Sequence, residues 1–174
     1  MLLSLIVLSV AGNITAQEQS EPLMPQRTAA VTDVVLGILG YTRWKSEPGP
    51  IDFCVTAPTE YADTLLHANL EVLGQPLIPQ RIEWDAEDIA LRCQVIYIGV
   101  MEETDYMSLS HRISGSPILT ISEQDERCSV GSMFCLLVNN LEVRFLVNLD
   151  SIARSGVRVH PHVLKLGNRT VVQE

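Results

Sequence analysis

Basic residues are scarce in this sequence. Only two of its 174 residues are lysines, Lys45 and Lys165, and its 12 basic residues face 21 acidic ones, which gives a formal net charge of −9. The other basic residues are arginines, and they form no run along the chain. A protein of this charge repels phosphate backbones, so we do not expect nucleic acid as a partner.

Several catalytic and metal-binding motifs are also missing. The turn after the first expected strand, Ala57-Pro-Thr-Glu60, lacks the glycines of a phosphate-binding loop, and neither G-x-S-x-G nor C-x-x-C occurs. His160 and His162 are close, but no acidic residue or cysteine is near them in sequence. We therefore predict a protein that is not an enzyme and that needs neither cofactor nor metal.

The N-terminus has the pattern of an export signal. Residues 1–11 form an apolar run shorter than the ~20 residues of a membrane-spanning helix, although no basic residue precedes it. We predict a signal peptide at 1–16, cleaved after Ala16, a flexible mature N-terminus at 17–28, and one domain at 29–174. A buried N-terminal helix is the alternative.

The four cysteines are Cys54, Cys93, Cys128 and Cys135. In an exported protein an even number of cysteines indicates disulfides. Two disulfides have three alternative connectivities, and the cysteines alone do not distinguish them. The spacing of the closest pair, Cys128 and Cys135, argues against a thioredoxin-type oxidoreductase.

The pattern of apolar residues and turn residues alternates between helix and strand. In residues 29–39 the apolar side chains recur at helical spacing, whereas 95–100 is a continuous apolar run typical of a strand covered on both faces. The expected helices are 29–39, 59–69 or 59–73, 85–91, 101–113 and 149–154, and the expected strands are 51–57, 80–84, 95–100, 118–121, 134–139 and 142–148.

This alternation predicts an α/β fold. We expect a three-layer, Rossmann-like or flavodoxin-like sandwich with a mostly parallel sheet and a C-terminal antiparallel hairpin. In the common 2-1-3-4 strand order the first and third strands are neighbours, which would bring Cys54 close to Cys93. This topology favours the pairs Cys54–Cys93 and Cys128–Cys135.

Two cationic segments are candidate binding sites. Arg158 and His160 point to the same side of an extended segment, and Arg43 and Trp44 follow the first helix. We predict that Arg43, Arg158 and His160 bind an amino-acid-like carboxylate. The alternatives are arginines paired within the protein and a tryptophan that covers the core.

Five stretches together resemble the YfiR family. They read LGILGYTRW (36–44), SGSPILTIS (114–122), GSMFC (131–135), VRFLVNLD (143–150) and HPHVLKL (160–166). The resemblance implies a periplasmic repressor that binds the periplasmic sensory domain of a membrane-bound diguanylate cyclase, YfiN, and lowers cyclic di-GMP synthesis and biofilm formation. It also implies an outer-membrane lipoprotein partner, YfiB, that sequesters the repressor.

The predicted partner surface is the hairpin. Phe134, Leu146 and Ile152 lie on or beside it, at a sheet edge where exposed apolar side chains favour association. We expect this region, with Arg43 and Trp44, to contact the partner or a second copy in a homodimer. We also expect the disulfides to respond to redox state. The alternative function is a periplasmic sensor or carrier of a small carboxylate.

Overall fold

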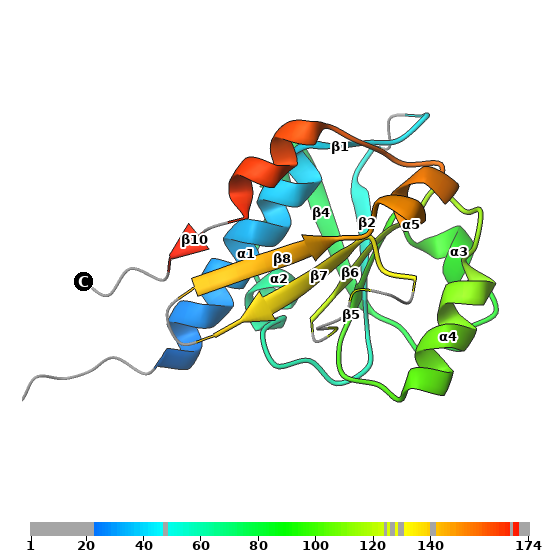
Figure 1. The fold of residues 1–174 in the computed structure, drawn as a ribbon, viewed down its shortest axis with the longest axis horizontal. Coiled ribbons are helices and arrows are strands. Elements are labelled where there is room, and N and C mark those ends of the chain that lie inside the picture. The colour runs from blue at the N-terminus through cyan, green and yellow to red at the C-terminus, as the bar shows by residue number, and fades with distance from the viewer. Residues whose placement is uncertain are drawn as a thin grey trace, which may run out of the picture.

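The structure is a computed structural model that describes residues 23–46, 49–123, 125, 128, 131–139, 142–167 and 169–170. The predicted signal peptide, 1–16, and residues 17–22 lie outside the described residues. The elements, shown in Figure 1, are α1 (Leu23–Gly40), β1 (Thr42–Arg43), β2 (Ile51–Thr56), α2 (Asp63–His67), β3 (Glu71–Val72), β4 (Gln75–Arg81), α3 (Ile89–Arg92), β5 (Val95–Ile98), α4 (Glu103–Arg112), β6 (Leu119–Ser122), β7 (Phe134–Val138), β8 (Glu142–Val147), α5 (Leu149–Arg154), β9 (Arg158–Val159), the 3₁₀ helix η1 (Pro161–Leu166) and β10 (Arg169–Thr170).

The main sheet is mixed and mostly parallel. Its eight strands lie in the order β10-β8-β7-β6-β5-β2-β4-β3. The strands β4, β2, β5, β6 and β7 run parallel, and β2 pairs with both β4 and β5. The predicted neighbours, the first and third parallel strands, are therefore adjacent, as in doubly wound folds.

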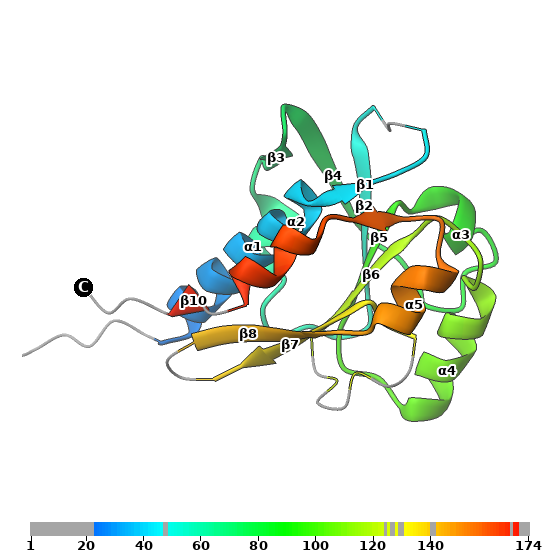
Figure 2. The same cartoon turned by 45° about the horizontal axis from the view of Figure 1, so that its top comes forward.

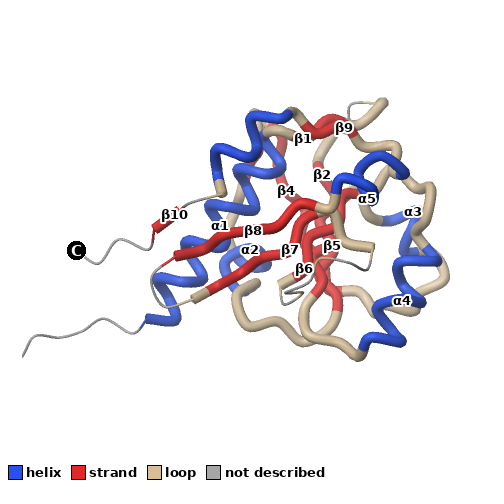
Figure 3. Tube along the Cα trace, viewed as in Figure 1, coloured by secondary structure: helices blue, strands red, loops and turns tan. Residues whose placement is uncertain are grey.

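Helices cover both faces of the parallel strands (Figure 3). On one face Phe53, Val95 and Tyr97 join the buried residues of α1 and α2. On the other face Cys54 and Ile96 pack with Ile89 of α3 and Leu109 of α4. The strand β5 is buried along its whole length, which explains its continuous apolar sequence. The chain thus has the predicted α/β architecture, although the described residues between β6 and β7 are not helical.

The first helix is longer than predicted. It begins at Leu23 instead of residue 29, so the second half of the segment predicted to be flexible, 17–28, is helical. Pro25 lies in the first turn, where a missing backbone N–H costs nothing. The buried apolar side chains of α1 are those of the predicted apolar stripe, Val31, Val34, Val35, Ile38 and Leu39.

The strand β4 begins at Gln75, whereas the sequence pattern predicted a start at residue 80. The prolines of β4 make its start difficult to predict. The Leu77 amide donates to the Leu70 carbonyl, on the outer side, whereas the Ile82 amide donates to Val55 of β2. By this alternation the nitrogen of Pro79 faces the outer edge, where no hydrogen bond to β2 is lost. Proline is tolerated at such positions, and it blunts the edge against further pairing.

The helix predicted from Thr59 is also shorter in the structure. The helix α2 covers only Asp63–His67, and no side chain caps its N-terminus. Instead of capping a helix, the Thr59 hydroxyl accepts a hydrogen bond from Arg81 Nη2 at 3.1 Å. Residues 57–62 therefore form a loop at the carboxyl end of β2.

The predicted hairpin is confirmed. The strands β7 and β8 pair antiparallel from Phe134↔Val147 to Val138↔Val143, and α5 covers the expected residues, 149–154. A separate two-stranded ladder joins β1 to β9. Figure 2 shows η1 lying along α1, so segments from the two ends of the described chain are neighbours.

The contact between two loops at the carboxyl end of the sheet supplies a stability test. A Cβ atom at Gly99 would lie 2.1 Å from the Pro58 carbonyl oxygen. We expect Gly99→Ala to lower the free energy of unfolding by about 1–3 kcal/mol in urea denaturation, because backbone must move. Gly49→Ala is the control, since a Cβ there meets nothing within 4 Å. Equal stability of the two variants would contradict this close approach.

Candidate functional site

Backbone hydrogen bonds join two loops at the usual ligand crevice of a doubly wound sheet in this protein. That crevice lies outside the carboxyl ends of the strands, where the strand order reverses. Here it falls between β2 and β5. The Gly99 amide donates to the Thr56 carbonyl at 2.9 Å, and the Val100 amide donates to the Pro58 carbonyl at 2.8 Å. These bonds hold the two loops together across the reversal point.

A buried glutamate adds to the contacts between these loops. Glu123 follows β6, and its side chain is almost fully buried, with 1% exposure. Its carboxylate accepts hydrogen bonds from the Glu60 amide at 2.9 Å, from the Tyr61 amide, and from the Tyr97 hydroxyl at 3.1 Å. Loop amides that hold a phosphate in nucleotide-binding proteins thus hold a side chain of the same chain here.

Burial controls the ionisation of this cluster. It raises the pKa of Glu123 above the ordinary value of 4.5, although the two amides and Tyr97 act in the opposite direction. The pKa of Tyr97 is raised well above its ordinary value, first by burial and then by the Glu123 carboxylate. The Tyr97 hydroxyl therefore stays protonated and serves as a donor.

The predicted carboxylate-binding residues do come together. Arg43 of β1 lies directly opposite Arg158 of β9, and the His160 amide donates to the Tyr41 carbonyl at 2.9 Å. The His160 ring stacks on Tyr41 with 6.2 Å between centroids. Arg43 Nη1 donates to the Gly40 carbonyl at 2.9 Å, and Arg158 has no ion-pair partner among the described residues.

Trp44 faces inward from this ladder. It is half-buried and packs against the main core. Its indole Nε1 is buried without a hydrogen-bond partner within the described chain. Trp44 and Arg43 line a small cavity of about 190 Å³ with Leu73 and Gln75. The tryptophan therefore covers the core, as in the alternative interpretation, and also borders a hollow next to the cationic pair.

The hairpin surface differs from the prediction at Phe134. This side chain is fully buried and packs edge-on against Phe145, with 5.5 Å between ring centroids. Phe134 belongs to the core because it lies on the face that α1 covers. Its side chain is therefore not available to a partner, and Ile152 is only half-exposed.

Two leucines form the exposed apolar part of this region. Leu146 of β8 is 38% exposed, and Leu149, at the start of α5, is 73% exposed. Sequence reasoning missed Leu149. The available signal was Asn148, a preferred N-cap residue, whose side chain accepts from the Ser151 amide at 2.9 Å and so places Leu149 in the exposed first turn.

The disulfides have the predicted pairing. Cys54 and Cys93 are joined with 5.8 Å between Cα atoms, and Cys128 and Cys135 with 5.5 Å. Cys135 pairs directly with Leu146 across the hairpin, and Asn148 Nδ2 donates to the Cys128 carbonyl at 2.9 Å. The short disulfide thus supports the surface that presents Leu146 and Leu149.

These features define an α/β domain with a disulfide-supported surface. A family model described as YfiR/HmsC-like matches residues 28–168. The chain therefore belongs to the YfiR/HmsC-like family, which confirms the resemblance seen in the sequence. This is a family of periplasmic, non-catalytic regulators, and it is associated with cyclic di-GMP signalling.

Two further observations concern the described residues. None of their helices has the length and hydropathy needed to cross a membrane. In the same part of the chain, no three histidine, cysteine or acidic side chains gather as a metal site, so His160 and His162 have no third ligand there. The two histidine rings lie edge-to-face, with 4.7 Å between centroids.

The raised pKa of Glu123 predicts a pH dependence of stability. Between pH 4.5 and the raised pKa the folded protein binds more protons than the unfolded chain, so this group's stabilising contribution falls as pH rises through that window. We expect the unfolding free energy of the wild type minus that of Glu123→Gln to fall as the pH rises through this window. The measurement is urea denaturation from acidic to neutral pH.

Glu87→Gln is the matched control, because Glu87 is an exposed carboxylate away from this cluster. The Glu123→Gln difference should change more over the same pH range than the Glu87→Gln difference. A constant difference for Glu123→Gln would show that Glu123 does not titrate above its ordinary pKa.

Proposed function

We propose that this protein is a periplasmic repressor that binds the sensory domain of a membrane-bound, YfiN-like diguanylate cyclase. Binding would favour the inactive conformation of the cyclase, because a ligand shifts an equilibrium only by its preference for one state. A YfiB-like outer-membrane lipoprotein would sequester the repressor. The leader at 1–16 would direct export, and residues 29–174 would form the mature domain.

One observation carries the proposed interface: two exposed leucines on a disulfide-supported edge. Leu146 and Leu149 lie on consecutive elements, β8 and α5. The strand β10 pairs only with Glu142 and Val143, so the rest of β8 has no described strand on its outer side. Apolar side chains beside open backbone groups suit a protein partner or a second copy in a homodimer.

A second candidate function is supported by the β1–β9 ladder. Two arginines directly opposite each other are unfavourable unless an anion lies between or near them. Arg43, Arg158 and His160 would then bind a small carboxylate, and the protein would sense or carry it. Calorimetry with amino acids separates this function from partner binding, and the two functions are compatible.

The interface is tested by charge substitution. Leu146→Asp and Leu149→Asp should each weaken binding of the mature protein to the cyclase sensory domain by about tenfold or more, because apolar contacts at an interface centre carry most of the affinity. Leu91→Asp is the control, since Leu91 is 89% exposed and lies on α3, outside both β8 and α5. Equal binding by all three variants would contradict the placement of the interface at Leu146 and Leu149.

The two disulfides should have different roles. Cys54–Cys93 and Cys128–Cys135 span 39 and 7 residues of sequence, and loop-closure entropy gives about 4 and 2.5 kcal/mol respectively. The paired serine variants should lose stability in that order. Loss of Cys128–Cys135 should weaken partner binding more than its effect on stability explains, because this bond supports the leucine surface.

The two disulfides should also differ in their response to redox state. Cys54–Cys93 links segments that the sheet already holds together, so we expect it to be incompletely formed and to respond to periplasmic redox state. Thiol labelling, melting and partner binding of the two serine pairs measure these roles. Four fully reduced cysteines in the active periplasmic protein would contradict them.

A further inference from the structure

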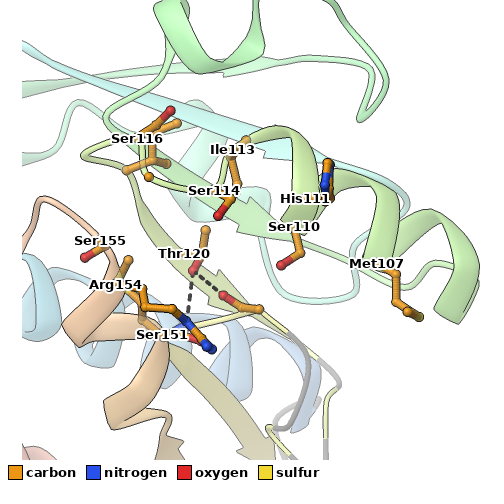
Figure 4. A pocket seen from close by; sticks show the side chains of 14 residues that line it. Met107, Ser110, His111, Ile113, Ser114, Ser116, Thr120, Ser151, Arg154 and Ser155 are labelled. Carbon is orange, nitrogen blue, oxygen red and sulfur yellow. Dashed lines mark hydrogen bonds between the residues drawn. The ribbon is translucent and has the colours of Figure 1, made fainter.

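A cavity of about 440 Å³ opens between α4, β6 and α5 (Figure 4). This volume is within the range of small-molecule sites. Ile113, Ile118 and Met133 provide buried apolar lining, and Met107 lies at the rim. Six hydroxyl side chains complete the lining: Ser110, Ser114, Ser116, Thr120, Ser151 and Ser155.

The walls of this cavity are fixed by internal contacts. Thr120 Oγ1 accepts from the Met133 amide at 3.0 Å and donates to the Gly131 carbonyl at 3.4 Å. Gly131 has φ +72° and approaches Ser110 so closely that a Cβ atom would lie 2.0 Å from the Ser110 Oγ. The cavity is therefore held by the sheet and does not depend on loop placement alone.

Most of the hydroxyl groups are available to a ligand. Thr120 and Ser155 are engaged, since Ser155 Oγ donates to the Ile152 carbonyl at 2.9 Å. Among the residues that the structure describes, the other four serine hydroxyls have no protein partner. Each can donate one hydrogen bond and accept others, so the set complements a molecule that carries hydroxyl groups of its own.

The charge of the lining selects against cations. None of the acidic residues that the structure describes lines this cavity. Figure 4 shows His111 on the α4 side and Arg154 on the α5 side. Among the described residues Arg154 pairs with Asp150 alone. Both side chains are 70% exposed, so this weak surface pair leaves the guanidinium free to turn toward a ligand.

We propose that this cavity binds a small polyhydroxylated molecule with one carboxylate, such as a sugar acid. The serine hydroxyls bind the ligand hydroxyls, the apolar lining contacts the carbon ring, and Arg154 pairs with the carboxylate. The Arg43–Arg158 pair does not line this cavity, and neither Leu146 nor Leu149 does, although α5 carries both Leu149 and Arg154. This site adds a ligand to the proposed function and does not depend on it.

The experiment uses D-glucuronate as the probe and D-glucose as its uncharged counterpart. Amide chemical shifts of the mature protein are followed by NMR during titration. We expect saturable shifts in the last turn of α4, at Thr120 and in α5, with a Kd of about 1 mM or below for glucuronate. Glucose should bind about fivefold more weakly, because it lacks the charge-assisted hydrogen bond to Arg154.

Two variants assign the site. Arg154→Gln should reduce glucuronate affinity to that of glucose and leave glucose binding unchanged. Arg112→Gln is the matched control, because it removes one exposed arginine of α4 that does not line the cavity. Shifts confined to Arg43, Arg158 and His160, equal binding of both sugars, or no saturation at about 10 mM would each overturn the proposal.

Discussion

The carboxyl end of the sheet depends on the buried carboxylate of Glu123. Two loop amides and the Tyr97 hydroxyl, from separate parts of the chain, donate to this one group. Burying a charge is costly unless donors surround it, and here three do. A side chain thus takes the place that an anionic ligand has in other doubly wound proteins, and the hairpin, the β1–β9 ladder and the α4–α5 cavity are candidate binding surfaces away from it.

The disulfides compensate for the parts of the fold with the least helix. The helix α3 has four residues, and Cys93 follows it directly, joined to Cys54 of β2. The described residues between β6 and β7 contain no helix, and Cys128 there is joined to Cys135 and held by Asn148. In both places a covalent bond holds a segment that would otherwise be fixed by side-chain packing of a longer helix.

The parts of the fold with strong local patterns could be predicted from the sequence. The apolar stripe of α1, the run in β5, the hairpin and the cysteine pairing follow from periodicity and topology. The start of β4 could not, because Pro76 and Pro79 indicate a loop unless the strand is known to lie near an edge. The role of Glu123 depends on amides about 60 residues earlier, and no local pattern reports such a contact.

Of the candidate surfaces, too, only a part could be predicted from the sequence. The pairing of Arg43 with Arg158 was within reach of the sequence, because two short extended segments carried the charges. The burial of Phe134 was not, because an apolar strand residue has the same appearance in sequence on either face of a sheet. Only the position of α1 on one face decides that Phe134 is covered while Leu146 is exposed.

The position of α1 also affects the order of events during biogenesis. This helix comes first among the described elements, yet it packs against β8, η1 and β10, which belong to the last part of the chain. Gly37 provides the space for Leu166, as a Cβ at Gly37 would lie 2.7 Å from it. The helix α1 also contacts α2, β1 and β3, but a chain that emerges from its N-terminus cannot complete the packing of α1 until nearly all residues have followed. The last step of folding, the packing of β8, η1 and β10 on α1, therefore follows once the chain has emerged almost completely.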